Sequence, residues 1–190
     1  MTAPRVVVIT GSVRRERLGA TIAAWVVDQA SGRADLQVEA LDLGTLTIPD
    51  DMAPHPDVDA LASVVGSADA LVIVTPEYNH SYPGPLKKAI DALRDEWTAK
   101  PVGFVSYGGI SGGLRAVEAL RLVFAELHAV SVRECVSFPH AWNQLDEQGR
   151  FVGDAAASKA ADRLFDQLWW WASALRAGRS RQPYPASPEF

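Results

Sequence analysis

The sequence predicts an α/β fold in which helices cover both faces of one doubly wound parallel sheet. Two observations lead to this prediction: short apolar runs alternate with helical patterns, and 190 residues with 48% hydrophobic content suffice for one well-buried core. We therefore expect a single domain over residues 1–178. Residues 179–190 hold three prolines and predict a disordered tail.

Five short apolar runs predict the strands, because branched apolar residues without alternation are typical of strands buried on both faces. The expected strands are Val6–Thr10, Leu36–Asp42, Ala70–Thr75, Val102–Ser106 and Val130–Val136. Between and after them, apolar residues recur at intervals of three and four, which predicts helices that pack on the sheet. The expected helices are Thr21–Ala30, Val58–Ser67, Leu86–Arg94, Leu114–Leu127 and Ala155–Leu175.

Two stretches fit neither pattern. Three prolines exclude a helix interior from Ile48–Asp57, so this stretch predicts a surface loop and a candidate wall of the active site. Pro139–Gly153 is too long for a simple turn, and predicts either an excursion over the surface or part of a subunit contact. Trp169, Trp170 and Trp171 point in different directions on a helix, so we expect core packing combined with an oligomer surface there.

The composition argues against several classes of partner. A formal net charge of −5 disfavours nucleic acid and anionic membranes, because binding these polyanions requires a basic face. Cys135 is the only cysteine and the histidines lack ligand spacing, so neither an intrachain disulfide nor a metal site is expected. No apolar run approaches the roughly 20 residues of a membrane span. We expect a soluble cytoplasmic protein.

The turn after the first strand has the features of a phosphate pocket. Gly11 lets the chain turn sharply, and the following helix directs free N–H groups and the positive end of its dipole at an anion. Ser12 adds a hydroxyl donor, and Arg14 and Arg17 add positive charge. Two better-known phosphate loops are excluded, because Gly-x-Gly-x-x-Gly needs a glycine at position 13 and the P-loop ends in Gly-Lys-Ser/Thr. One alternative is a turn in which Ser12 only caps the helix, and another is a solvated turn in which Glu16 pairs with a neighbouring arginine. The positive charge of Arg14 beside Arg15 and Arg17 favours the phosphate pocket.

Two further loops follow the third and fourth strands, at the edge where open parallel sheets bind ligands. In Thr75–Gly84, aromatic residues and prolines offer a stacking surface for a planar ring, while Asn79 meets its polar edge. In Ser106–Gly113, the backbone N–H groups of Gly108 and Gly109 approach a ring carbonyl without obstruction. A phosphate pocket, a stacking wall and a donor loop together indicate a mononucleotide with an electron-accepting ring, hence FMN.

The motifs in these loops are Gly11-Ser12-x-Arg14, Pro76-Glu77-Tyr78-Asn79 with Pro83-Gly84-x-Leu86-Lys87, and Gly108-Gly109 with Gly112-Gly113. With them the chain resembles the NAD(P)H-dependent FMN reductase family, which has a flavodoxin-like fold and includes quinone, azo-dye and chromate reductases. The resemblance implies strand order 2-1-3-4-5, FMN as cofactor, NADPH or NADH as electron donor, and a homodimer or homotetramer. The expected cofactor-binding residues are Gly11, Ser12, Val13, Arg14, Arg17, Pro76, Glu77, Tyr78, Asn79, Ser106, Tyr107, Gly108, Gly109, Gly112 and Gly113.

The first loop departs from the family at Arg17 and Gly19, where many members carry serine and asparagine. Arginine replaces a hydroxyl donor to phosphate and adds charge, so we expect FMN binding to survive. Arg15 is expected to face solvent.

The expected function is reduction of FMN, or of a small-molecule acceptor, by NAD(P)H in a two-electron hydride transfer. Flavin N5 carries this chemistry, so no catalytic residue is expected, and neither Glu77 nor His80 is assigned such a role. A quinone, free flavin, an azo dye or a metal oxyanion remains open as acceptor, and so does transfer of reduced FMN to a monooxygenase. The alternative is an FMN-binding electron carrier or flavin-responsive module without NAD(P)H turnover.

Overall fold

A single sheet forms the centre of the protein, whose computed structural model describes residues 2–185. All five strands are parallel and lie in the order β2-β1-β3-β4-β5, which confirms the expected fold class and strand order. The strands are β1 (Arg5–Thr10), β2 (Gln37–Asp42), β3 (Ala70–Pro76), β4 (Pro101–Gly108) and β5 (Val130–Pro139). Strand order reverses between β1 and β3, since β2 lies on one side of β1 and all later strands lie on the other.

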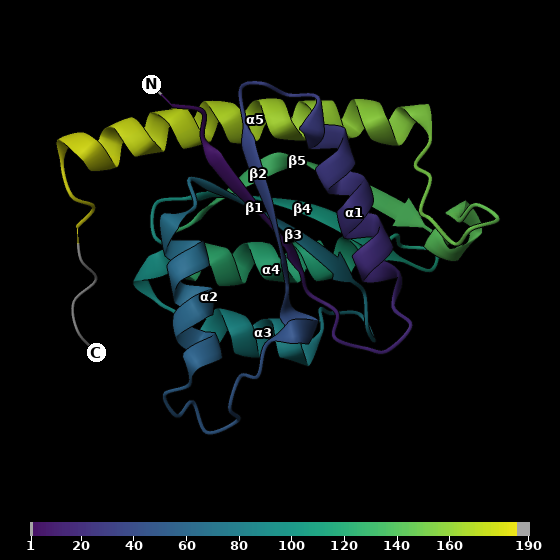
Figure 1. Ribbon diagram of the computed structural model, residues 1–190, viewed down its shortest axis with the longest axis horizontal. Helices are drawn as coiled ribbons and strands as arrows, with labels where there is room; N and C mark the ends of the chain where they lie inside the picture. The colour runs from purple at the N-terminus through teal and green to yellow at the C-terminus, as the bar shows by residue number, and fades with distance from the viewer. Residues whose placement is uncertain (1, 186–190) are drawn as a thin grey trace.

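Helices cover both faces of the sheet, as Figure 1 shows. The helices are α1 (Leu18–Ser31), α2 (Pro56–Ser67), α3 (Gly84–Asp91), α4 (Leu114–Glu126) and α5 (Ala155–Arg181). α1 and α5 lie on one face, and α2, α3 and α4 lie on the other. Successive side chains of a strand point to opposite faces, so Val6 and Val8 of β1 join the core under α1 and α5. Val7 and Ile9 join the second core, under α2, α3 and α4.

The last two strands are longer than their apolar runs predict. β4 continues from Ser106 to Gly108, and β5 continues from Val136 to Pro139. The two ends pair with each other, Gly108 opposite Pro139, so hydrogen bonding rather than hydropathy defines them. This pairing carries Tyr107 and Gly108 to the carboxyl edge of the sheet in a fixed register.

Helix α5 extends to Arg181, past the boundary expected after residue 178. Arg179 donates a hydrogen bond to the carbonyl of Ala99, and Arg176 donates to the carbonyl of Thr2 at 2.6 Å. These bonds hold the last turns of the helix on the amino edge of the sheet. Of the expected tail, residues 186–190 lie outside the described residues.

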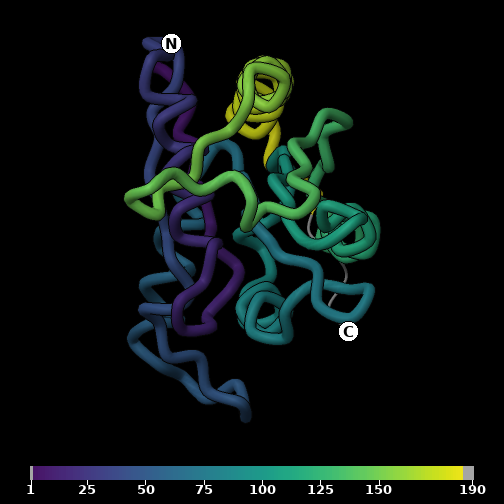
Figure 2. Tube along the Cα trace, turned by 90° about the vertical axis from the view of Figure 1, so that its right-hand side faces the viewer, coloured from purple at the N-terminus to yellow at the C-terminus, as the bar shows by residue number. Residues whose placement is uncertain are grey.

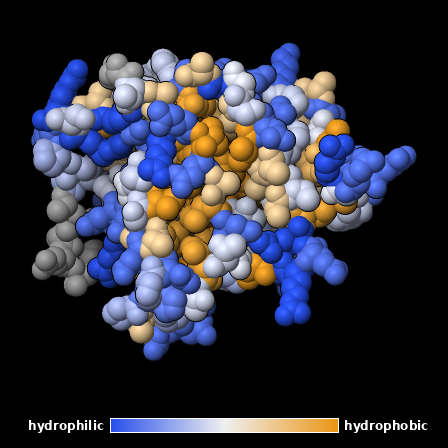
Figure 3. Space-filling view, in the orientation of Figure 1, coloured by the Kyte–Doolittle hydropathy of each residue, from blue (hydrophilic) through white to orange (hydrophobic). Residues whose placement is uncertain are grey.

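The surface around β2 combines apolar and charged regions. Figure 3 shows apolar surface gathered near the middle of the face drawn in Figure 1, with charged surface around it. The loop between η1 (Leu43–Thr45) and α2 projects away from the body, as Figure 2 shows, and it matches the surface loop expected at Ile48–Asp57. No helix within residues 2–185 is both long enough and apolar enough to cross a membrane.

Candidate functional site

A cavity of about 490 Å³ opens at the carboxyl edge of the sheet, where the loops after β1, β3 and β4 meet. It lies at the reversal of strand order between β1 and β3, where open α/β sheets bind ligands. The residues that line it are Arg14, Arg15, Glu16, Arg17, Leu18, Pro76, Glu77, Tyr78, Tyr107, Gly108, Gly109 and Trp142. All three loops expected to form a site therefore meet in one cavity.

Tyr78 joins the first loop to the second. Its hydroxyl lies 2.9 Å from Oγ of Ser12, and the Arg14 guanidinium lies over its ring, 3.8 Å from the ring centre. A guanidinium is attracted to the negative face of an aromatic ring, and this contact fixes Arg14 in the cavity wall. Ser12 is fully buried and its hydroxyl engages Tyr78, so it stands behind the lining rather than in it.

The second loop is built around a tight turn. Backbone N–H groups of Tyr78 and Ser81 donate to each other's carbonyls at 2.8 and 3.1 Å. Asn79 and His80 between them have φ angles of +49° and +73°, the left-handed region that such two-residue turns require. The turn carries Asn79 to an exposed tip, outside the lining of the cavity.

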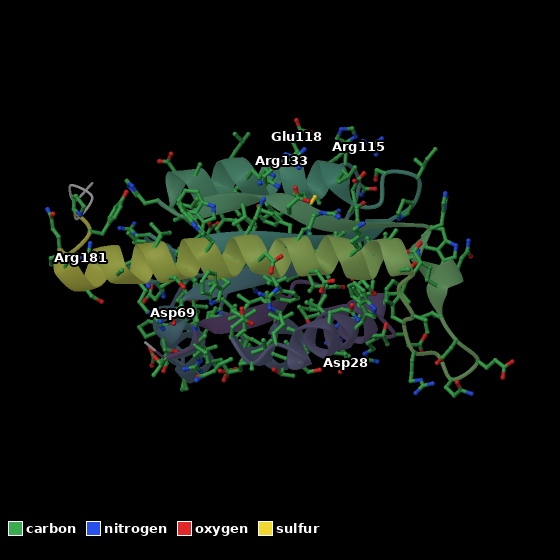
Figure 4. The ribbon with its side chains drawn as sticks, turned by 90° about the horizontal axis from the view of Figure 1, so that it is seen from above. Asp28, Asp69, Arg115, Glu118, Arg133 and Arg181 are labelled. Carbon is green, nitrogen blue, oxygen red and sulfur yellow. The ribbon has the colours of Figure 1, made fainter. Side chains whose placement is uncertain are left out.

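Glu77 joins the second loop to the third. Its Oε2 accepts from the Ser111 hydroxyl at 2.7 Å and from the Arg115 backbone N–H at 3.2 Å, and its Oε1 accepts from the Arg115 guanidinium at 2.7 Å. Burial raises the pKa of Glu77, but the donors of Ser111 and Arg115 outweigh burial and hold the pKa below its usual value. Figure 4 shows Arg115 at the loop end of α4. The carboxylate is thus ionised and engaged in ordering the two loops.

The glycines at the end of the third loop shape the backbone. Gly113 has a φ angle of +86°, and a Cβ there would lie 2.8 Å from Cβ of Ser106 and 2.8 Å from the Tyr107 nitrogen. The carbonyl of Gly112 accepts hydrogen bonds from Ser106 at 2.8 Å and Ser137 at 3.0 Å. These residues support the loop from behind the cavity, and only glycine fits at position 113 without strain.

Trp142 forms a wall of the cavity that the sequence did not identify. It belongs to η3 (Ala141–Gln144), and it is 53% exposed. The backbone N–H of His140 donates to the carbonyl of Gly109 at 3.1 Å, and the His140 ring packs edge-on against Trp142. A Cβ on Gly109 would meet only Trp142, at 4.0 Å, so this backbone is open to a ligand. The available signal was the position of Trp142 just after β5, whose carboxyl end meets the same edge.

Tyr107 reaches from β4 toward the start of α1. A Cβ on Gly19 would lie 2.8 Å from the Tyr107 hydroxyl, so glycine at this position makes room for the aromatic side chain. Burial raises the pKa of Tyr107 well above its usual range, the neighbouring Tyr78 adds to the effect, and Ser12 opposes it. The hydroxyl stays protonated, and it lies beside Ser12 and Gly19.

Arg17 is held by the protein on two sides. Its guanidinium pairs with Asp42 at the end of β2, and its Nη1 donates to the carbonyl of Arg14 at 3.2 Å. Its Nε is buried and has no hydrogen-bond partner among residues 2–185. Arg17 is also the N-cap of α1, whose first turn has neither a capping side chain nor an acidic residue. The free N–H groups at the start of α1 and the positive charge of Arg17 in the cavity lining fit an anion such as a phosphate.

Eight of the fifteen expected residues line the cavity, and seven do not. Those outside the lining are Gly11, Ser12, Val13, Asn79, Ser106, Gly112 and Gly113. Arg15 is exposed, as expected, and it also lines the open cavity together with Glu16 and Leu18. The loop at Ile48–Asp57 contributes no lining residue, so it is not a wall of this cavity. Within residues 2–185 no group of three or more histidine, cysteine or acidic side chains is arranged to hold a metal ion.

Comparisons with known proteins show which proteins the chain is similar to. Residues 4–143 match the family described as NADPH-dependent FMN reductase. An NAD(P)H-dependent FMN reductase of Schizosaccharomyces pombe is 40% identical over 121 residues, which cover 58% of this chain and 60% of the relative. A 2-hydroxy-1,4-benzoquinone reductase of Burkholderia sp. is 33% identical, over 66% of this chain and 68% of the relative.

Solved structures share the fold over nearly the whole chain. FerB, a flavoenzyme NAD(P)H:(acceptor) oxidoreductase of Paracoccus denitrificans, superposes with a TM-score of 0.73 at 26% identity. The match covers 90% of this chain and 98% of that one.

Proposed function

Since the chain belongs to the NADPH-dependent FMN reductase family, we propose that it binds FMN in the cavity at the carboxyl edge and reduces it, or a small-molecule acceptor, with NAD(P)H. The observation that carries the proposal is the meeting of all three loops in one cavity at the reversal of strand order. The sequence match covers 60% of the S. pombe relative's own length, so its activity is taken here as a guide to the class of reaction.

The first loop is proposed to hold the FMN phosphate. Arg14 and Arg17 supply positive charge, and the uncapped start of α1 supplies backbone N–H groups. Gly11, Ser12 and Val13 shape the turn that brings these groups to the cavity. Binding by two arginines suits a phosphate that carries close to two negative charges.

The second and third loops are proposed to hold the flavin ring. Pro76 and Tyr78 offer an apolar and aromatic wall, and Gly108 and Gly109 offer backbone that a ring edge can approach closely. Tyr107 adds a protonated hydroxyl. Asn79 shapes its turn, and Ser106, Gly112 and Gly113 shape the third loop.

When bound, FMN would supply the hydride-transfer chemistry, with the three loops of the cavity holding it. The protein aligns donor and acceptor on one face of the cavity and supplies hydrogen-bond donors, which requires no acid or base. Glu77 is engaged with Ser111 and Arg115, so it orders the loops and moves no proton.

Partners and location complete the proposal. A second copy of the chain, as dimer or tetramer, suits the exposed tryptophans Trp142, Trp169 and Trp170. A quinone, free flavin, azo dye or metal oxyanion serves as acceptor, with transfer of reduced FMN to a monooxygenase as a further use. The cytoplasm supplies the nicotinamide donors.

Anaerobic reduction tests the proposal. The purified protein, loaded with FMN, is mixed with NADPH or NADH, and the visible absorbance of the oxidised flavin is followed. Rapid bleaching is expected, followed by reoxidation when a quinone is added. Bound flavin that stays oxidised would favour the electron carrier or binding module instead. Failure to bind FMN at all would overturn the proposal.

A further inference from the structure

We propose that Asp42 is a positioning residue of the phosphate site, which holds Arg17 in place as a second phosphate-binding guanidinium beside Arg14. This inference rests on the proposed binding of FMN. It assigns a role to a residue of β2, a strand that contributes no residue to the lining of the cavity.

The register of the sheet brings Asp42 to the first loop. Asp42 is the last residue of β2 and lies opposite Thr10, the last residue of β1. The first loop leaves the sheet directly after Thr10. The pairing of β1 with β2 therefore places the Asp42 carboxylate beside the first loop, although Asp42 lies 25 positions after Arg17 in the sequence.

The carboxylate of Asp42 has a fixed orientation because its two oxygens have different partners. Oδ1 accepts from the backbone N–H of Gly44 at 2.8 Å, and Oδ2 accepts from the Arg17 guanidinium. The bond to Gly44 caps η1 and does not depend on any ligand. Oδ2 is thus presented to Arg17 by a rigid turn.

The space around the Arg17 guanidinium is also matched to it. A Cβ on Gly44 would lie 2.6 Å from Nη2 of Arg17, so only glycine leaves room for the side chain in this position. Nη1 donates to the carbonyl of Arg14, which ties the two arginines of the loop together. Each terminal nitrogen makes one of these bonds and carries a second N–H, so the guanidinium of Arg17, which lines the cavity, keeps donors for a phosphate oxygen. Its Nε is buried and has no partner among the described residues.

The charge of Asp42 gives the inference a sharp test. By charge alone, a carboxylate close to the cavity repels a phosphate, so its removal should strengthen FMN binding. If Asp42 positions Arg17, its removal should weaken FMN binding instead, because the guanidinium loses its fixed geometry. The two views predict opposite signs.

The first experiment compares Asp42→Asn with the unchanged protein, using FMN and riboflavin as probes in fluorescence titrations. Riboflavin lacks the phosphate. We expect FMN affinity to fall about 5- to 20-fold, less than for outright loss of a charge-assisted interaction because Arg17 itself remains, and riboflavin affinity to stay within about twofold. Glu39→Gln is the matched control, because it breaks the Arg5–Glu39 pair between the same two strands, away from the cavity.

Unchanged or tighter FMN binding by Asp42→Asn would overturn the inference, and so would equal losses for FMN and riboflavin. If the unchanged protein bound neither flavin, the proposed function itself would fail, which is a distinguishable result.

A second experiment uses Gly44→Ala and a double-mutant cycle. Gly44→Ala keeps Asp42 but places a methyl group against the guanidinium, so it should reproduce the FMN-selective loss. In an Arg17→Ala background, Asp42→Asn should cause no further loss of FMN affinity, since a positioning residue acts only through its partner. Additive losses in the cycle would overturn the inference. Urea unfolding of each variant identifies any that fail to fold.

Discussion

The two edges of the sheet carry arginines and carboxylates in contrasting arrangements. At the amino edge, Asp69 accepts from the backbone of Arg5 at 3.0 Å and pairs with Arg176 and Arg179 at 3.1 and 3.5 Å. Figure 4 shows Asp69 beside the C-terminal half of α5. Lys100, beside them, donates to two carbonyls at the end of α2 at 2.6 and 2.7 Å. Within residues 2–185, no buried side-chain nitrogen or oxygen of this group lacks a partner.

At the carboxyl edge, the same residue types are incompletely paired. Arg17 is bound to Asp42, yet its Nε has no partner among the described residues. Positive φ angles occur at both edges, at Glu16 and Gly113 near the cavity and at Ala99 beside Arg179, so the pairing of charged groups separates the two edges. The contrast teaches that full pairing makes a charged cluster a stabilising clamp, whereas donors left over make it a binding site.

The largest expected effect tests the amino edge. Asp69→Ala leaves two arginines without their carboxylate, so the free energy of unfolding should fall by about 3 kcal/mol in urea titrations. FMN affinity of the folded fraction should not change. Asp28→Ala, on an exposed position of α1, is the control and should stay within about 0.5 kcal/mol. If Asp69→Ala also weakened FMN binding by about 3 kcal/mol, the two edges would not have separate roles.

The next effect tests the carboxyl edge. Arg14→Ala removes a charge-assisted contact to the phosphate, so FMN binding should weaken by roughly 1.5–3 kcal/mol in a titration. The free energy of unfolding should hardly change, in contrast to Asp69→Ala. Arg133→Ala, exposed on β5, is the control for loss of one positive charge. Unchanged FMN affinity would exclude Arg14 from the phosphate site.

A pair of glycine substitutions tests how closely the backbone is packed at the third loop of the carboxyl edge. Gly113→Ala introduces a Cβ 2.8 Å from the backbone nitrogen of Tyr107, at a φ angle of +86°. The free energy of unfolding should fall by roughly 1–3 kcal/mol, and FMN binding should weaken. Gly149→Ala has a similar φ angle of +74° but meets nothing within 4 Å. It carries the strain without the collision, so its loss should be smaller and FMN binding should be intact. Equal losses would show that crowding at position 113 is unimportant.

The smallest expected effect is a pH dependence at the amino edge. Burial and the charge of Arg179 lower the pKa of Lys100 from 10.5 to about 8, although Asp69 and Glu96 oppose them. Between these values the unfolded chain binds more protons, so the free energy of unfolding should rise with pH. Relative to Lys100→Met, the free energy of unfolding of the unchanged protein should rise by less than about 1.4 kcal/mol per pH unit. A difference that is flat from pH 8 to pH 10.5 would contradict the shifted pKa.

The fold was predictable from the sequence because the three inner strands, β1, β3 and β4, are compact buried apolar runs and the helices repeat their apolar spacing. The loops were predictable for the same reason, since each follows a strand whose end could be located. Contacts between side chains from separate loops were not. The pairing of Arg17 with Asp42 depends on the register of β1 and β2, and the position of Trp142 depends on the bond between His140 and Gly109.

Several residues of the expected site prove to support it from behind. The motif residues Ser12 and Ser106 are fully buried, and their hydroxyls engage Tyr78 and Gly112. A sequence motif marks positions where the backbone or a side chain is constrained, and it does not tell a lining residue from one that shapes the lining. Only the three-dimensional arrangement separates the two.

The contact between Asp69 and Arg176 spans 107 residues and has a consequence for synthesis on the ribosome. Helix α5 is made after the other described elements, yet it covers the core face that β1, β3 and β4 share with α1. Until it emerges, that apolar face is open and Asp69 has no arginine partner from α5. The nascent chain therefore completes its core and its amino-edge clamp in the same late event, and an intermediate that lacks α5 is the form most exposed to aggregation.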